Sequence, residues 1–405
     1  MIRVAVSQTG AGGDRPVSAT AEDVGRSNAS SILSTVLTDG PIARAEIAAR
    51  VGLTRATVTR VTNRLMELGL LVEEPPRRDN PGRPLIPLAM AGADRAAISV
   101  HLGARESRVG LVDLQGNILI ELRDRYPDKE PEHLIETVAS RVASLVAEHG
   151  SSKRILGIGA SIGGWVRPET GVVVRFEPLD WRDVPLAAML ADATRLPVLL
   201  DQFARGLARA ERMFGAARNL QDVLLVWLGS VVDAALVHDG DVQRGPDGAV
   251  GIITHFPVRG SIDDSCPCGR VGCLGRALTD EALVAEAHRR GLVPSEATIR
   301  DLIRLADVPW TGVPELVTEI AGITAEAVAA MADLTNPSAV LVAGLLTTTP
   351  TFLPAFREEL GARAVLGGAL EVRKSSFGDM APTAASAAVL IGHFFADPIG
   401  FELQS

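Results

Sequence analysis

The chain has 405 residues, of which 47% are hydrophobic, and a formal net charge of −9 at pH 7. This length is enough to bury a large core and predicts two or three domains. No apolar run is long enough to span a bilayer and no signal-peptide pattern begins the chain, so we expect a cytoplasmic protein without membrane insertion.

Residues 1–25 mix Gly, Ser, Thr, Pro and charges without periodicity, which is typical of a mobile tail. After them, apolar residues recur at helical spacing in three successive segments. We therefore predict three short amphipathic helices that share one small core, within a domain covering residues 26–90. The apolar positions are Ile32, Leu33, Val36 and Leu37, then Ile47, Ala48 and Val51, then Val58, Val61, Leu65 and Leu68.

The order of these segments is typical of a helix-turn-helix that binds DNA. Gly52 stands where the turn before the third helix needs a positive φ, and Thr54 is placed to cap that helix. The third helix is then expected to enter the major groove, where polar side chains contact base edges or phosphates. The predicted DNA-binding residues are Arg44, Thr54, Arg55, Thr57, Thr59, Arg60 and Arg64, together with Gly82 and Arg83 of the following segment.

That following segment, GLLVEE and then PPRRDNPGRPLIPL, predicts two short strands joined by an arginine-rich loop, the wing of a winged helix-turn-helix. Gly82 and Arg83 would enter a minor groove, and arginine there favours A·T-rich DNA. The alternative is that the loop arginines are only solvated. Residues 26–84 carry nine arginines and six acids, or +3, which leaves −12 for the rest of the chain. We therefore expect only this domain to face DNA, with salt-dependent affinity.

From Arg95 onward, strands alternate with helices in a pattern that begins twice. AAISVHLG, SRVGLVDL and GNILIELR predict strands, a helix follows over 131–149, and RILGIGAS predicts another strand. QDVLLVWLG and VVDAALVHDG begin the second copy, with helices over much of 279–334 and the strand SAVLVAG. The expected body has a first lobe at 95–220, completed by a C-terminal helix at about 380–398, and a second at 221–379. A cleft between two such lobes suits a small ligand.

The cysteines predict a metal site. Cys266, Cys268 and Cys273 are the chain's three cysteines and fall within eight residues, and His255 lies eleven positions before the first. Three sulfurs and one imidazole nitrogen are typical of a closed, tetrahedral structural zinc site, so we expect one zinc ion per chain. A disulfide is disfavoured in a reducing compartment, and the alternative is three buried free cysteines.

A winged helix-turn-helix followed by this body, with HFPV and CPCGRVGCLG in its second half, resembles the ROK family of sugar-responsive repressors and sugar kinases. The resemblance covers about residues 26–398 and also rests on RPETGVV, DWRDVPLAAMLADATRLPV and NPSAVLVAG. It implies a DNA-binding domain on an actin-like, hexokinase-like two-lobed α/β body, assembled as a dimer or tetramer. It further implies a transcription factor, usually a repressor, whose two winged helices read a two-fold-symmetric operator.

The resemblance predicts no enzyme, because the residues that the family's kinases use for catalysis are replaced in this chain. The first-strand Asp of the kinases is His101 here, and the catalytic Asp that takes the sugar proton is Phe203. A phenyl ring cannot act as a base. The glycine-rich phosphate segment reads GSVVDAA, which is poor for binding a polyanion. A sugar kinase remains the alternative hypothesis of the enzyme class.

The sugar-binding positions of the family are also changed. GExGH reads GIITH, which puts Ile252 in place of its Glu, and the Glu after the cysteines is Gly275. A plain hexose is therefore not expected. A more hydrophobic or anionic effector is the working hypothesis, and the alternatives are an abandoned pocket filled by Phe203 and Ile252, or a regulator controlled by a protein partner. The cleft residues assigned to an effector are His101, Trp165, Gln202, Phe203, Arg205 and His255.

Overall fold

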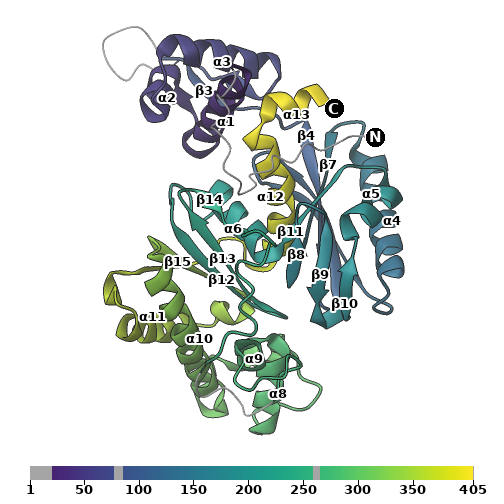
Figure 1. The fold of residues 1–405 in the computed structure, drawn as a ribbon, viewed down its shortest axis with the longest axis vertical. Helices are drawn as coiled ribbons and strands as arrows, with labels where there is room; N and C mark the ends of the chain where they lie inside the picture. The colour runs from purple at the N-terminus through teal and green to yellow at the C-terminus, as the bar shows by residue number, and fades with distance from the viewer. Residues whose placement is uncertain (1–20, 77–84, 259–264, 405) are drawn as a thin grey trace. The chain divides into compact units, whose positions relative to one another are not determined.

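The computed structural model describes residues 21–76, 85–258 and 265–404 (Figure 1). The chain divides into two compact units. The first, here called the winged-helix unit, contains the described residues up to Asp94 together with those from Ile391 onward. The second, here called the body, is Arg95–Leu390.

Three helices form the winged-helix unit as predicted: α1 (Ala21–Asp39), α2 (Arg44–Val51) and α3 (Arg55–Glu67). The predicted apolar positions supply their common core, in which Ile32, Ile47 and Leu65 are fully buried. The tail boundary at residue 25 needs correction, because α1 already begins at Ala21. An acid in the first turn, such as Asp23, stabilises a helix N-terminus without adding to the apolar pattern that set the boundary. The rest of the predicted tail lies outside the described residues.

A small antiparallel sheet completes the winged helix. Its strands are β1 (Ile42–Ala43), β2 (Leu71–Glu73) and β3 (Pro87–Met90), in the order β1-β3-β2. β2 and β3 are the two predicted wing strands, but the loop that carries Gly82 and Arg83 lies outside the described residues. At the other end of the chain, α13 (Pro398–Gln404) packs against α1.

Two five-stranded mixed sheets give the body its two lobes. In both, the first three strands in chain order are antiparallel neighbours, and the fourth and fifth continue from the first in parallel. This shared topology confirms the duplicated α/β body. The first sheet contains β4 (Arg95–Leu102), β5 (Glu106–Asp113), β6 (Ile118–Arg125), β7 (Arg154–Ile162) and β11 (Val198–Gln202). The second contains β12 (Val223–Leu228), β13 (Val232–His238), β14 (Asp241–Val242), β15 (Ala339–Ala343) and β16 (Glu371–Lys374).

Helices cover both sheets. One face of the first sheet packs on α4 (Pro131–His149), at the predicted bounds, and on α5 (Leu186–Thr194). α6 (Phe203–Phe214) packs against strands of the second sheet and against α12 (Ala381–Ala396). The predicted C-terminal helix is thus present, but the division at Leu390 assigns its last turns to the winged-helix unit. The second lobe adds α7 (Leu274–Leu278), α8 (Asp280–Arg289), α9 (Ile299–Leu305), α10 (Val313–Thr335) and α11 (Phe352–Arg363).

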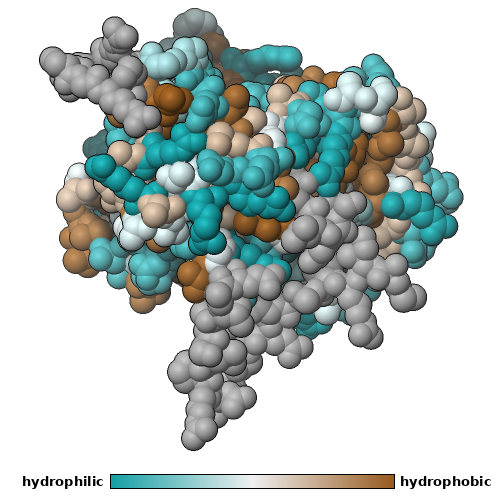
Figure 2. Space-filling view, turned by 90° about the horizontal axis from the view of Figure 1, so that it is seen from above, coloured by the Kyte–Doolittle hydropathy of each residue, from teal (hydrophilic) through white to brown (hydrophobic). Residues whose placement is uncertain are grey.

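A third sheet of three short strands, β8 (Trp165–Arg167), β9 (Val172–Phe176) and β10 (Trp181–Val184), belongs to the first lobe. Within the described part of the chain, no helix combines the length and apolar composition needed to cross a bilayer. On the face drawn in Figure 2, hydrophilic residues cover much of the coloured surface and hydrophobic residues form smaller separate groups.

Candidate functional site

The turn before α3 has the geometry that its sequence predicts. Gly52 ends α2 in the left-handed region at φ 67°, where a side chain would be strained. Thr54 then caps α3, because its hydroxyl oxygen accepts a hydrogen bond from the Thr57 backbone N–H at 3.2 Å. These two residues set the start of α3 relative to α2.

One face of α3 is open to solvent. Arg55, Thr59 and Arg60 are exposed on it, and no described residue forms an ion pair with either of these arginines. Arg64 is exposed further along and lies 3.0 Å from Glu67. Asn63 belongs to the same face but was missed in the sequence analysis, although its spacing of four from Thr59 signals it. An asparagine amide can bond adenine in the major groove.

Arg44, in contrast, contacts other parts of its own domain. Its Nε donates to Thr62 Oγ1 at 3.1 Å, and a terminal nitrogen lies 2.9 Å from a Glu73 carboxylate oxygen. The side chain therefore joins α2 to α3 and to the wing strand β2. A guanidinium held in this way positions the reading helix within its own domain.

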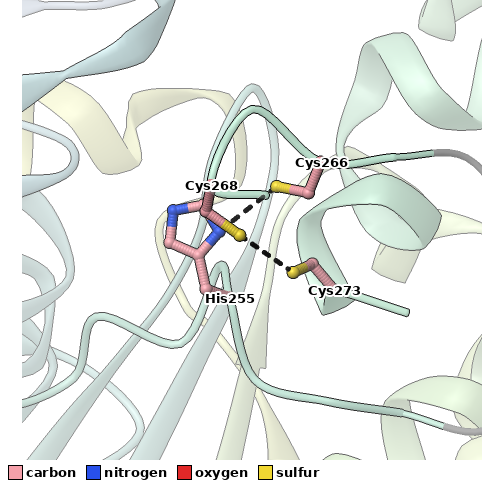
Figure 3. Close-up of side chains that lie close together, drawn as sticks. All are labelled: His255, Cys266, Cys268 and Cys273. Carbon is pink, nitrogen blue, oxygen red and sulfur yellow. Dashed lines mark hydrogen bonds between the residues drawn. The ribbon is translucent and has the colours of Figure 1, made fainter. Parts of the chain in front are cut away.

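The four predicted metal ligands converge in one cluster (Figure 3). Their ligand atoms all lie within 4.8 Å of one another. Cys266 Sγ is 3.4 Å from His255 Nδ1, and Cys268 Sγ is 3.5 Å from Cys273 Sγ. Tetrahedral zinc bonds place two thiolates about 3.8 Å apart, and a thiolate and an imidazole nitrogen about 3.6 Å apart. The donor set and its spacing thus fit zinc with little adjustment.

Backbone geometry holds this cluster together. Gly269 and Gly272 have φ values of 85° and 78°, which let the cysteine segment turn back on itself. The Cys266 N–H donates to the Arg270 carbonyl at 2.8 Å across that turn. In the absence of a cation, burial and the neighbouring thiols raise the pKa of Cys273 to about 12. A bound dication would reverse that preference, because metal-ligating thiols are deprotonated.

A carboxylate of the first lobe approaches the back of the histidine ligand. His255 Nε2 lies 3.6 Å from Glu177 Oε1, and Arg175 Nε lies 2.8 Å from the same oxygen. Glu177 belongs to the 3-10 helix η1 (Glu177–Leu179) between β9 and β10. Carboxylates in this position fix the orientation of a metal-ligating imidazole and make it more basic.

We expect Glu177→Gln to weaken zinc binding by about 10–100-fold, the effect typical of lost partners behind a ligand histidine. Zinc affinity would be measured by competition with a chromophoric chelator. Glu148→Gln, which changes an exposed carboxylate on α4, is the matched control. Equal affinities in the two variants would contradict a role for Glu177 at the metal site.

A small cavity in the body is bordered by residues of both lobes. Its volume is about 30 Å³, and its walls include His101, Gly103, Phe203, Trp227 and Ser230. Such a volume can hold water, but pockets for small ligands hold about 300–1,000 Å³. In this form of the body the cavity has no room for a hexose.

Aromatic packing explains why the cavity is so small. The Phe203 ring is 4.9 Å from that of His101 and 4.6 Å from that of Trp227, with edge-to-face geometry in both pairs. Phe203 is almost completely buried. Phe203 therefore fills space between the lobes.

Gln202 and Arg205 are not among the residues that line this cavity. Both are fully buried, and Gln202 caps α6 by accepting from the Arg205 N–H at 3.0 Å. Arg205 Nε donates to Asp201 Oδ1 at 2.7 Å. Its terminal nitrogens donate to the backbone carbonyls of Gly248 at 2.8 Å and Val166 at 3.4 Å. The guanidinium thus ties three segments of the body together, with no donor directed at a ligand.

Asp201 is the buried anion at the centre of this arrangement. Burial acts to raise its pKa, but the guanidiniums of Arg205, Arg209 and Arg244 outweigh burial, and the pKa is lowered. The carboxylate is therefore charged and fully paired inside the protein. Breaking one member of such a buried set is strongly destabilising, which assigns Asp201 and Arg205 to structure.

The remaining predicted effector residues are also separated from the cavity. Trp165 Nε1 donates to the Asp247 carbonyl at 2.8 Å, and Arg167 lies over its ring. His255 belongs to the metal cluster. Of the six residues assigned to an effector, the structure thus brings His101 and Phe203 together at one cavity, and sequence spacing could not reveal that the others turn elsewhere.

Two further positions that the resemblance singles out, Gly275 and Asp233, are enclosed by neighbouring residues of the body. A Cβ atom at Gly275 would lie 2.6 Å from Thr254 Cγ2, so this position has no space for a side chain. Asp233 of the GSVVDAA segment is fully buried and accepts from the Gly164 N–H at 3.1 Å. Burial raises the pKa of Asp233 to about 7. The acid of this segment is thus enclosed in the body and bonded to its backbone.

Comparison with known proteins explains this combination of parts. The family model described as ROK family matches residues 97–392, which is nearly three quarters of the chain, and the one described as MarR family matches residues 23–80. The chain belongs to the ROK family. Its N-terminal domain is a MarR-like winged helix-turn-helix, and the resemblance drawn from the sequence is thereby confirmed.

Relatives with known names place the chain among regulators of the ROK family. A transcriptional regulator of Mycobacterium tuberculosis is 30% identical over 392 residues, covering 92% of this chain and 87% of the relative. The DNA-binding transcriptional dual regulator NagC of Escherichia coli is 24% identical over 364 residues, covering 83% of this chain and 89% of NagC. The chain is accordingly a DNA-binding transcriptional regulator of this family.

Solved ROK structures support the two-lobed fold. A ROK family transcriptional regulator described as a homologue of the Escherichia coli MLC protein superposes with a TM-score of 0.79 at 20% identity, covering 94% of this chain and 99% of that one. A ROK family glucokinase from Streptomyces griseus gives 0.64 at 22% identity, covering 72% of this chain and 98% of the kinase. The hexokinase-like body is therefore shared by regulators and kinases, and the fold alone does not separate the two functions.

Proposed function

We propose that this ROK protein is a homodimeric or tetrameric repressor in the cytoplasm that reads a two-fold-symmetric, A·T-rich operator. The observation that carries the proposal is the solvent-exposed face of α3, with Arg55 and Arg60 unpaired by any described residue of the chain. Arg64 and Asn63 extend this face, and Arg83 of the wing would add a minor-groove contact. Thr54 and Gly52 position the helix for this task.

The same proposal gives the cysteine cluster a structural zinc ion, held by His255, Cys266, Cys268 and Cys273. Zinc would supply a closed tetrahedral centre with no position for substrate. What supports this role is the placement of Glu177: a first-lobe carboxylate lies behind a histidine of the second lobe. Zinc binding would then order the second-lobe loop against η1.

We also propose that the body does not phosphorylate sugars. Phe203 occupies the position of the catalytic base and is packed between two rings, and Asp233 places an acid in the phosphate segment. The small cavity supports regulation by a ligand that inserts a group no larger than a carboxylate or carbonyl. The alternative is regulation in which the two lobes open. Control by a protein partner is the second candidate, favoured by the inward-facing Gln202 and Arg205.

The operator hypothesis is tested by incubating purified protein with fragments of the source genome at moderate salt and sequencing those retained. A sharp two-fold-symmetric, A·T-rich site is expected, and its spacing of half-sites should be about one helical turn or a multiple. Retention of fragments without an enriched site would overturn sequence-specific reading by α3. Footprinting on the enriched site would show whether two copies bind.

Kinase activity is expected to be absent from this protein. With ATP and a panel of hexoses and N-acetylated hexosamines, ADP release should not exceed the rate measured without sugar, because no base reaches a sugar hydroxyl. Coupled detection of ADP gives the measurement, with a ROK glucokinase as positive control. Sugar-dependent turnover would contradict the regulator-only assignment of the body.

A further inference from the structure

A chain of hydrogen bonds in the body leads from the small cavity to α12. His101 Nδ1 lies 3.0 Å from Ser161 Oγ, which lies 2.7 Å from Ser386 Oγ. Ser386 Oγ donates to the Pro382 carbonyl at 2.9 Å. His101 and Ser161 are register partners on β4 and β7, and the hydroxyls of Ser161 and Ser386 are buried. A buried polar chain in a core of this kind is costly unless each group is satisfied.

The carbonyl at the end of the chain fixes its direction. A hydroxyl has one proton, and that of Ser386 is used on Pro382, so the Ser386 oxygen accepts from Ser161. Ser161 has then used its own proton and accepts from His101 Nδ1. Burial lowers the pKa of His101 to about 3, which leaves the ring neutral. His101 therefore carries its proton on Nδ1, and its Nε2 is free to accept a hydrogen bond. Nε2 lies close to Gly103, which lines the cavity: a Cβ atom added to Gly103 would be 3.6 Å from it.

The last member of the chain belongs to a helix that is part of both units. The backbone of α12 lies directly on its neighbours, because a Cβ at Gly159 of β7 would be 2.1 Å from the Ser386 carbonyl oxygen. At Gly206 of α6 a Cβ would be 2.7 Å from the Ala385 carbonyl oxygen. The helix continues past Leu390 into the winged-helix unit, where α13 follows it and packs on α1. A change at Ser386 thus acts on a helix continuous with the DNA-binding unit.

We propose that His101, Ser161 and Ser386 form a reversible hydrogen-bond switch between the cavity and α12; this inference rests on the regulator function proposed above. A ligand group that donates a hydrogen bond to His101 Nε2 leaves the bonds from His101 to Pro382 in the direction described above. A hydrogen-bond acceptor in the cavity, such as a carboxylate or carbonyl oxygen, requires a proton on Nε2. Water supplies the proton that the ring takes at Nε2 and accepts the proton released from Nδ1, so the charge of the ring is unchanged, and the two serine hydroxyls turn without losing their protons.

Tautomer exchange reverses every bond in the chain. Ser161 donates to His101 Nδ1, and Ser386 donates to Ser161 instead of Pro382. The freed Pro382 carbonyl removes a local bond from the first turn of α12, and serine bonds of this type are known to bend helices. Ser161 and Ser386 are positioning residues in this scheme, and the ligand class selected by the switch is a small hydrogen-bond acceptor.

The direction of the chain is tested without any ligand by nitrogen-15 NMR of histidine-labelled protein. Wild-type His101 is expected as the Nδ1–H tautomer. In Ser386→Ala, Ser161 loses its acceptor and can donate to the ring, so the Nε2–H tautomer should appear. Ser144→Ala removes a hydroxyl with the same bond to a carbonyl four residues earlier, on exposed α4, and should leave His101 unchanged. An Nε2–H tautomer in the wild type, or no change in Ser386→Ala, would overturn the switch.

The effect on DNA is tested with two substitutions of His101 and the selected operator fragment. The carboxylate of His101→Asp only accepts and imposes the reversed direction, whereas the amide of His101→Asn can donate. Operator dissociation constants of these variants are expected to differ by about 5–150-fold, the usual range of coupling between sites. Adding Ser386→Ala to both should abolish the difference. If the two His101 variants still differ when Ser386→Ala is present, transmission through Ser386 is overturned. Failure to select any operator would count against the proposed function and leave the NMR result standing.

Discussion

Cys273→Ser is expected to abolish stoichiometric zinc binding and to lower the melting temperature of the body by about 5–9 °C. One tetrahedral ligand is lost, and structural zinc contributes about 10–16 kcal/mol in small peptide domains. A third of that value is about 3–5 kcal/mol, and its loss from a body that spans Arg95–Leu390 shifts the transition by about 5–9 °C. Cys273 is also the N-cap residue directly before α7, so the loss should extend from the loop into the second lobe.

Elemental analysis of zinc per chain and differential scanning calorimetry would measure the two effects. Ser265→Ala is the matched control, since it alters an exposed side chain next to Cys266 and leaves the four ligands intact. Wild-type protein treated with a chelator should melt like the Cys273→Ser variant. Full zinc content in Cys273→Ser, or an unchanged melting temperature despite metal loss, would rule out a four-ligand structural site.

The double substitution Arg55→Ala, Arg60→Ala is expected to weaken operator binding by about 100-fold or more. A well-placed arginine contact to a base is worth about 1–3 kcal/mol, and two such contacts combine to this loss. Neither side chain has an ion-pair partner among the described residues, so folding should be little affected. Stability should therefore stay near that of the wild type while affinity falls.

Fluorescence anisotropy with a labelled operator fragment would give the affinity at several salt concentrations. Arg304→Ala, on the exposed side of α9 in the body, is a control that changes the net charge without touching the winged helix. A shallower salt dependence in the double variant would assign one or both arginines to phosphates. Binding that survives both substitutions would mean that α3 is not the reading helix.

Features encoded within a few neighbouring residues were predictable from the sequence. Gly52 and Thr54 indicate the start of α3, and the spacing of the three cysteines indicates a metal cluster. Both were predictable because the relevant contacts are made within one turn or loop. The duplicated strand pattern likewise predicted two α/β halves, and both sheets have the same topology. In each case local chemistry determines the structure.

The interior of the candidate effector site could not be predicted in the same way. Arg205 contacts carbonyls at Val166 and Gly248, about forty residues away on either side, and no local pattern indicates that the guanidinium turns inward. The hydrogen bond between Ser161 and Ser386 joins positions 225 residues apart. The residue types show which hydrogen bonds these side chains can form. Only the packing of strands and helices determines which partners they contact.

The close contact between Gly275 and Thr254 limits which side chains position 275 can hold. A glutamate restored there would have its Cβ 2.6 Å from Thr254 Cγ2, and Thr254 also donates to the Val232 carbonyl at 2.8 Å. A glutamate at this position therefore needs Thr254 to shift or to be replaced. Serine at 254 would remove the methyl group and keep the hydroxyl that bonds Val232. The two positions are thus coupled, and the residue at 254 decides which side chains position 275 accepts.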